Sequence, residues 1–320
     1  MCLLTLALDE SRRFPLVVAA NRDEFFARPA ARLGWWTPEP GATQILGGRD
    51  LDAGGTWLGL SAEGRLGLLT NVRDPSRQDP SAPSRGRIVP EWLAARERVD
   101  QFWMRTALAG YNGFNLIAAD FALGECYWAS NNGSHPQRLE RGVYGLSNAG
   151  LDTPWPKVVA LKARTREAVA ESASIDELAA RLFEALADRS VPGDSALPDT
   201  GIGLDKERML APAFIRSPDH AYGTRCSTLI ITERVNRHNV THVLERSFAP
   251  NGGMALLRRA TLNHWPPRYS AGDAVPAMQG GAVAESEVDG TLVAVPQRRT
   301  RVRSLLRPEA KRRRGSSVGA

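Results

Sequence analysis

Cys2, the second residue of the chain, has the clearest chemical potential. A small second residue allows the initiator Met1 to be removed, and Cys2 then carries a free α-amine beside its thiol. The amine has an ordinary pKa of about 8, so it can accept the proton of a thiol whose ordinary pKa is about 8.5. Cys2 would thus combine a nucleophile and its base. Its position alone also fits a cysteine that merely begins a buried strand.

A charged tetrapeptide, Asn21-Arg22-Asp23-Glu24, follows the apolar segment 16–20. The fixed charge of Arg22 would lower the thiol pKa, and Asp23 would hold and orient the ammonium form of the amine. A charged segment after a strand is also typical of a solvated turn. The choice depends on whether the fold brings this segment beside Cys2.

The apolar pattern predicts that it does. Apolar runs at 3–8 and 16–20 flank a polar stretch, which is typical of a β-hairpin. Further strands are predicted at 56–60, 66–70, 114–119, 126–129, 142–146, 227–233, 240–248 and 254–259. Helices are predicted at 90–108, 157–170 and 175–187, the last opening on a capping box of Ser174 and Glu177. This order favours an α+β fold in which sheets pack between helix layers.

Charge and composition separate a folded domain from a tail. The net charge is +6, but residues 298–314 hold nine Lys or Arg and one Glu, which leaves 32 basic and 34 acidic residues elsewhere. We predict a nearly neutral domain over 1–265 and a mostly disordered, basic Pro/Gly/Arg-rich tail over 266–320. The tail would give at most a weak contact to nucleic acid or anionic lipid, so nucleic acid is not a predicted partner.

The remaining composition indicates a protein of a reducing compartment. Cys2, Cys126 and Cys226 are too far apart for a disulfide framework or a Cys-x-x-Cys site, which predicts a cytoplasmic protein. Charged residues interrupt the first segment, and no apolar run approaches the roughly 18 residues of a membrane span. No phosphate-binding or dinucleotide fingerprint is present, so no cofactor is predicted. His238 and His242 lack a ligand partner at metal-site spacing, so no metal site is predicted either.

Several short motifs together carry a family resemblance. Beyond Met1-Cys2 and Asn21-Arg22-Asp23-Glu24 they are Gly54-Gly55-Thr56-Trp57-Leu58-Gly59, Leu69-Thr70-Asn71, Ser84-Arg85-Gly86, Tyr144-Gly145-Leu146-Ser147-Asn148, Trp155-Pro156-Lys157 and Gly223-Thr224-Arg225. With them the chain resembles the NRDE proteins, also called the transport and Golgi organisation 2 family, over roughly residues 1–262. The resemblance implies a four-layer αββα sandwich related to N-terminal-nucleophile (Ntn) hydrolases. Within that group it points to the cysteine amidases acting on bile salts, penicillin V and N-acyl lipids.

The resemblance also implies a set of site residues. The wider group places an arginine and an aspartate after the cysteine strand, asparagines near the oxyanion, and another arginine late in the chain. By order and motif context the implied catalytic set is Cys2, Arg22, Asp23, Asn71, Asn148 and Arg225. An asparagine amide aimed at a developing oxyanion contributes roughly 3–4 kcal/mol in acyl transfer. Before the resemblance, both asparagines fit loop residues that satisfy backbone groups.

The sequence therefore favours an N-terminal-cysteine hydrolase of non-peptide C–N amide bonds, with an N-acyl amide as substrate. A second hypothesis is a non-catalytic carrier or chaperone of a hydrophobic ligand on the same fold, since animal members of the family are linked to haem mobilisation and to lipid or acyl-CoA homeostasis. Residues 145–149 also resemble a serine nucleophile elbow, with His220 or His242 as the base. They lack its second glycine, so a serine hydrolase is the least favoured reading.

Overall fold

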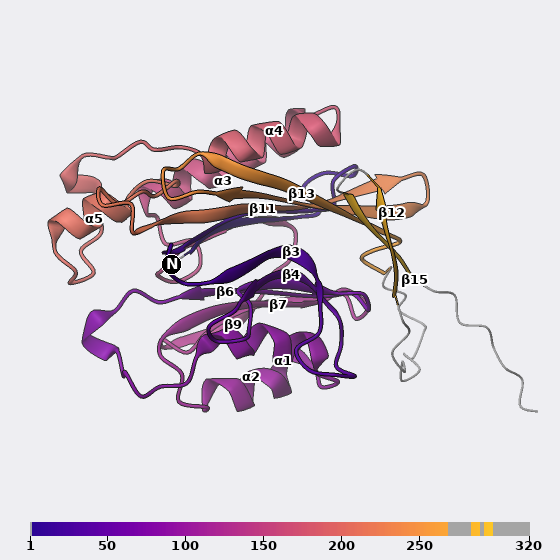
Figure 1. Ribbon diagram of the computed structural model, residues 1–320, viewed down its shortest axis with the longest axis horizontal. Helices are drawn as coiled ribbons and strands as arrows, with labels where there is room; N and C mark the ends of the chain where they lie inside the picture. Colours follow the sequence, from indigo (N-terminus) through magenta and orange to yellow (C-terminus); the bar gives the residue numbers. More distant parts are fainter. Residues whose placement is uncertain (1, 268–282, 289–290, 297–320) are drawn as a thin grey trace, which may run out of the picture.

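Two β-sheets form the centre of the protein, and helices lie on their outer faces (Figure 1). The computed structural model describes residues 2–267, 283–288 and 291–296. The eight-stranded sheet has the order β10-β1-β2-β11-β12-β13-β15-β14. Its strands are β1 (Cys2–Leu8), β2 (Leu16–Phe25), β10 (Gly142–Leu146), β11 (Tyr222–Val235), β12 (His238–Phe248), β13 (Met254–Asn263), β14 (Val283–Val288) and β15 (Thr291–Pro296).

The second sheet has seven strands that follow the chain order from β3 to β9. They are β3 (Ala30–Trp36), β4 (Ile45–Asp50), β5 (Leu58–Ser61), β6 (Arg65–Asn71), β7 (Phe114–Asp120), β8 (Glu125–Ser130) and β9 (Ser134–Arg138). All strand pairs of both sheets are antiparallel except β13 with β15, which is parallel. The described residues also form the helices α1 (Ile88–Ala94), α2 (Val99–Ala107), α3 (Pro156–Glu171), α4 (Ile175–Leu186) and α5 (Leu204–Leu210).

Three apolar clusters explain the layers. Strand β1 is buried on both faces because Leu4 and Leu6 pack between the two sheets, whereas Leu3 and Ala7 pack toward α3 and α4. The outer face of the seven-stranded sheet packs instead against residues of α1 and α2. Figure 1 shows α3 and α4 over one sheet and α1 and α2 over the other. The mixed α+β class predicted from the sequence is confirmed.

Most predicted elements near the site are present. The hairpin of β1 and β2 is confirmed, and so is the helix start at Ser174, whose Oγ accepts a hydrogen bond from the backbone amide of Glu177 at 3.1 Å. Strands β3, β4 and β9 and helix α5 were not predicted. Their segments are short or lack a clear apolar period.

The single helix predicted over 90–108 is wrong, because the structure has two helices separated by residues 95–98. The guanidinium of Arg65 donates to the carbonyl oxygens of Trp92 at 3.1 Å, Ala95 at 2.6 Å and Glu97 at 2.9 Å. Its Nε is paired with Asp120 at 2.9 Å. A buried cation thus takes the carbonyl groups that a continuous helix would have used for its own backbone bonds.

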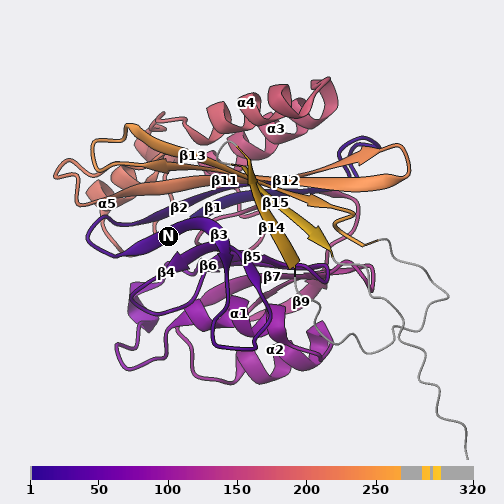
Figure 2. The same cartoon turned by 45° about the vertical axis from the view of Figure 1, so that its right-hand side comes forward.

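The predicted tail is only partly covered by the structure. Strands β14 and β15 extend the eight-stranded sheet beyond β13 (Figure 2), within the segment predicted to be mostly disordered. Residues 268–282, 289–290 and 297–320, which include the densest basic cluster, lie outside the described residues. The boundary at residue 265 and the disordered tail remain predictions.

Candidate active site

The β1–β2 hairpin places Cys2 beside Arg22. The two residues are direct partners in the antiparallel register, and on the other side of β2 Arg22 is the partner of Cys226 in β11. The alternation along β1 puts Cys2 on the face that carries Leu4 and Leu6, which is the face toward the second sheet. Cys2 is half-buried at the strand end. The predicted approach of the charged tetrapeptide to Cys2 is therefore present.

Cys2 opens onto a pocket of about 530 Å³, here called the cysteine pocket. The pocket lies between the start of β1, the end of β2, the β4–β5 connection, the end of β6 and the loop 78–86. Its lining residues are Cys2, Arg22, Asp23, Glu24, Arg28, Asp50, Asp52, Ala53, Thr56, Trp57, Leu69, Asn71, Gln78, Asp79, Pro80, Ala82, Pro83, Ser84, Arg85, Gly86 and Asn112. Charged and polar side chains form much of this wall, so the pocket suits a small polar ligand.

Gly55 and Gly86 lie where two segments of the pocket wall meet, the β4–β5 connection and the loop 78–86. The backbone amide of Thr56 donates to the carbonyl oxygen of Gly86 at 2.9 Å. A Cβ atom on Gly55 would lie 1.9 Å from that same oxygen. The glycine is therefore required for the close approach of the β4–β5 connection to the loop 78–86.

Arg22 is nearly fully buried, at 5% exposure, and is held by weak ion pairs. Its Nη2 lies 3.5 Å from Asp50 and 3.8 Å from Glu24, and its Cζ lies 4.3 Å from the ring centroid of Trp57. Among the described residues, Nη1 of Arg22 has no hydrogen-bond partner. A buried guanidinium with a spare donor is suited to bind an anionic or strongly polar oxygen of a ligand.

The thiol of Cys2 is not a spontaneous thiolate in this environment. Burial raises its pKa above the ordinary value, and the negative charge of Asp23 raises it further. The positive charges of the chain amino terminus and of Arg22 act in the opposite direction. The balance keeps Cys2 protonated near neutral pH, so nucleophilic attack from Cys2 requires a base that takes the proton.

Asp23 is buried beside the cysteine and belongs to a polar cluster. It accepts a hydrogen bond from Oγ1 of Thr224 at 2.6 Å. Burial raises the pKa of Asp23, while the amino terminus, Lys157 and Arg22 oppose the rise through their positive charges. The carboxylate is thus placed where it can stabilise a cation at the start of β1.

Lys157, which was not predicted as a site residue, is the buried cation near Asp23. It lies at the start of α3 and is 8% exposed, and its Nζ donates to the carbonyl oxygen of Leu210 at 2.7 Å. Burial lowers the pKa of Lys157 to about 8, although the negative charge of Asp23 works against the decrease. The motif Trp155-Pro156-Lys157 was the available signal, but a helix-start lysine is usually solvated.

The two predicted asparagines have different positions. Asn71, at the end of β6, lines the cysteine pocket. Asn148 is 1% exposed and lies behind it, where its Nδ2 donates to the carbonyl oxygen of Asn71 at 2.8 Å. Next to it, Oγ of Ser147 donates to the carbonyl oxygen of Cys2 at 3.0 Å. Asn148 and Ser147 thus fix the backbone at two lining residues.

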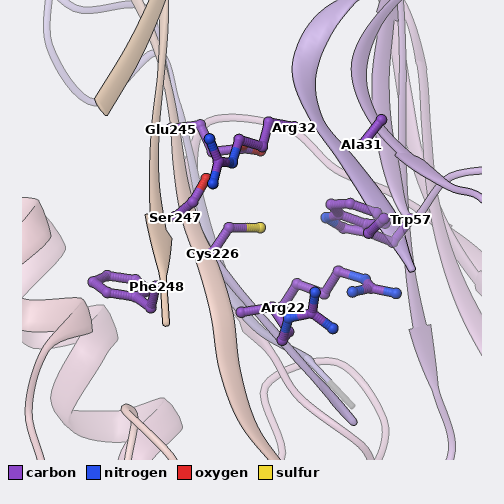
Figure 3. Close-up of a pocket in the computed structure, with 10 residues that line it drawn as sticks. Arg22, Ala31, Arg32, Trp57, Cys226, Glu245, Ser247 and Phe248 are labelled. Atoms are coloured by element: carbon purple, nitrogen blue, oxygen red, sulfur yellow. The ribbon is translucent and has the colours of Figure 1, made fainter. Parts of the chain in front are cut away.

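Arg225 lies on the other side of Arg22, away from the cysteine pocket. Its Nη1 donates to the carbonyl oxygens of Phe25 at 2.7 Å and Arg28 at 2.9 Å, which fixes the turn after β2. Arg225 lines a second, smaller pocket that also contains Cys226 (Figure 3). Of the six predicted residues, Cys2, Arg22, Asp23 and Asn71 line one pocket, while Asn148 and Arg225 support it from behind and from the side.

Among the described residues, neither candidate histidine is placed to act as a base for Ser147. Ser147 is 2% exposed and bonded to the backbone of Cys2. His220 contacts Arg216, and His242 lies near Arg259 and Thr261, on different elements. Burial and the nearby Arg259 charge lower the pKa of His242. Neither histidine is hydrogen-bonded to Ser147 within the described part of the chain.

With this geometry established, comparison with known proteins places the chain. The family model described as Transport and Golgi organisation 2 matches residues 1–250. This chain belongs to the Transport and Golgi organisation 2 family. All six predicted site residues and Lys157 lie within the matched range, so the site is part of the region shared with the family.

Individual members of the Transport and Golgi organisation 2 family are similar over most of their length. A mouse Transport and Golgi organization 2 homolog is 35% identical over 253 residues, covering 73% of this chain and 89% of the relative. The human homolog is 34% identical over 287 residues, covering 84% and 97%. A Drosophila melanogaster relative is 25% identical over 280 residues, covering 79% of this chain and 95% of the relative.

Over residues 2–267, 283–288 and 291–296, none of the helices has the length and apolar character that a membrane span needs.

Proposed function

We propose that this member of the Transport and Golgi organisation 2 family is an N-terminal-cysteine hydrolase that cleaves a non-peptide C–N amide bond of a small N-acyl amide. One observation carries the proposal: Cys2 begins strand β1, lines the cysteine pocket and is paired with the buried Arg22. A nucleophile, a fixed cation and a buried carboxylate are together at the open end of the β1–β2 hairpin, as acyl transfer requires.

The reaction would begin after removal of Met1. The α-amine of Cys2 takes the thiol proton, and the sulfur attacks the amide carbon to form a C–S bond and an oxyanion. Collapse of this intermediate breaks the C–N bond, and the leaving amine takes the proton from the Cys2 ammonium group. Water then attacks the thioester, the amine accepts one of its protons, and the acid and the free thiol are released.

The surrounding residues would act on charge and position. The Nδ2 of Asn71 and the spare Nη1 of Arg22 are the donors proposed for the oxyanion. Asp23, kept ionised with the help of the Lys157 charge, would hold the Cys2 ammonium in place. Asn148 is proposed as a positioning residue, because it holds the Asn71 backbone and does not line the pocket.

Two features of the chain support the proposal beyond the site. Sheets packed face to face between outer helices are consistent with the four-layer αββα arrangement of Ntn hydrolases, in which the nucleophile begins a strand (Figure 1). Cys2, Cys126 and Cys226 are all free thiols, which suits the predicted cytoplasmic, reducing location. The basic cluster of the tail, for which a weak contact to nucleic acid or anionic lipid is predicted, lies outside the described residues.

The carrier hypothesis is less favoured by the pocket. A carrier of haem or of an acyl chain needs a largely apolar cavity, whereas five carboxylates line the cysteine pocket, those of Asp23, Glu24, Asp50, Asp52 and Asp79. Among the described residues, no histidine lines this pocket. A small polar acyl amide agrees better with this wall.

Intact-protein mass spectrometry tests the proposal directly. The native protein and the variants Cys2→Ser and Cys126→Ser are measured before and after incubation with a panel of small N-acyl amides. We expect loss of Met1 and an acyl adduct that persists in Cys126→Ser and is lost in Cys2→Ser. Retention of Met1 in the mature protein would exclude the hydrolase and favour the carrier. So would tight stoichiometric ligand binding that forms no adduct and that persists in Cys2→Ala.

A further inference from the structure

A second pocket adjoins the cysteine pocket on the far side of Arg22 and Trp57, which line both. It has a volume of about 140 Å³ and is here called the arginine pocket. Its lining residues are Arg22, Ala30, Ala31, Arg32, Trp57, Arg225, Cys226, Glu245, Ser247 and Phe248. In Figure 3 the Cys226 sulfur points into the space between Arg32 on one side and Arg22 and Trp57 on the other.

A β-bulge gives the arginine pocket two consecutive lining residues. In a regular strand Arg225 and Cys226 would point to opposite faces. The register between β2 and β11 shifts between Thr224 and Cys226, so Arg225 is the extra residue. The bulge turns its side chain to the same pocket as Cys226.

The charges around this pocket are unbalanced. Three arginines line it, and Glu245 is the one carboxylate in its lining. Glu245 is used elsewhere, since it accepts a hydrogen bond from the backbone amide of Leu33 at 2.8 Å, and burial raises its pKa. Within the described residues, neither Arg32 nor Arg225 forms an ion pair.

Arg22 and Arg225 also act on each other. Burial lowers the pKa of Arg225, and the positive charge of Arg22 lowers it further. The carboxylates that pair with Arg22, those of Asp50 and Glu24, line the cysteine pocket and not the arginine pocket. An anion between the arginines would relieve this repulsion.

We propose that the arginine pocket binds a carboxylate of the same ligand whose amide lies at Cys2. The inference rests on the proposed hydrolase for the position of the amide, and it adds the chemical class of the ligand. The small volume admits a terminal carboxylate and little more. The substrate would thus be a small amide with a remote acid group.

The strand register gives the separation between the two groups. Cys2, Arg22 and Cys226 are paired residues on three adjacent strands. Two strand spacings amount to ~10 Å. This is the length of about three extended residues, so roughly eight to nine bonds separate the amide carbon from the carboxylate. An acid group directly next to the amide would be too close to reach the arginine pocket.

Isothermal titration calorimetry of the Cys2→Ser protein tests this assignment without turnover. The probes are monoamides of linear dicarboxylic acids of increasing chain length, each compared with the neutral diamide of equal length. We expect the monoamide to bind at least tenfold more tightly than its diamide, with the largest preference near the length derived above. Arg32→Gln, added to the Cys2→Ser protein, should remove most of that preference. Arg234→Gln, at an exposed position of the same strand as Arg225, should retain it.

The outcomes separate this inference from the proposed function. Equal affinity for monoamide and diamide, or a preference that Arg32→Gln leaves intact, would overturn the arginine pocket as a carboxylate site. Inorganic phosphate could also compete with the monoamide as strongly as a carboxylate does, in a way that Arg32→Gln abolishes. This result would make the arginine pocket a phosphate site and would overturn its assignment as a carboxylate site. A clear carboxylate preference without any acyl adduct on the native protein would instead refute only the hydrolase.

Discussion

Lys157 gives a quantitative test of the buried polar cluster behind Cys2. Its pKa is about 8 in the folded protein against an ordinary value of 10.5. At 1.36 kcal/mol per pH unit, this difference corresponds to ~3 kcal/mol by which burial disfavours the ammonium form. We therefore consider the substitution Lys157→Met, which removes the charge and keeps a side chain of similar length.

The direction in which Lys157 changes the free energy of unfolding with pH follows from proton binding. Between pH 8 and 10.5 the unfolded chain keeps a proton on Lys157 that the folded protein has released, so this residue adds stability as the pH rises. Below pH 8 both states are protonated and the contribution no longer changes. The free energy of unfolding of the native protein minus that of Lys157→Met should thus increase by ~1.4 kcal/mol per pH unit above pH 8, reaching about 2–3 kcal/mol near pH 10.

Urea denaturation of both proteins at pH 7, 8, 9 and 10 measures this difference, because the pH dependence of all other groups is common to the two chains. Lys206→Met, at an exposed position on α5, is the matched control and should give a flat difference. If the difference for Lys157→Met is flat as well, the pKa of Lys157 is not lowered by burial. The proposal that its charge helps to keep Asp23 ionised would then also fail.

Three further predictions concern the site and its frame. Iodoacetamide at pH 8 should modify Cys2, which is half-buried and lines the pocket, but not Cys126, which is buried and whose pKa burial raises to about 12. Comparable labelling of both, seen by peptide mass spectrometry, would contradict this. Asn71→Ala should slow acyl-adduct formation about 10²–10³-fold with little loss of ligand affinity, and an unchanged rate of adduct formation would remove Asn71 from the oxyanion site. Gly55→Ala should lower the free energy of unfolding by more than ~2 kcal/mol, because its Cβ would lie 1.9 Å from the Gly86 carbonyl oxygen; thermal melting within 2 °C of the native protein would disprove that close approach.

Local patterns explain why part of the site could be predicted. The apolar runs on either side of residues 9–13 required a hairpin, and a hairpin of equal arms places Arg22 opposite Cys2 whatever the rest of the chain does. The helix over 90–108 failed for a nonlocal reason, because Arg65, far away in sequence, takes the carbonyl oxygens at the break.

The sequence by itself determined the α+β class, the strand that begins at Cys2 and the charged tetrapeptide beside it, since these depend on residue periods within one or two adjacent elements. Only the tertiary structure decided that Asn71 faces the pocket while Asn148 lies behind it, that Lys157 is buried near Asp23, and that Arg225 turns into a second pocket. These positions depend on how α3, β6 and the bulge in β11 pack against the hairpin. Such packing is set by side-chain volume and burial across distant segments, which no local pattern encodes.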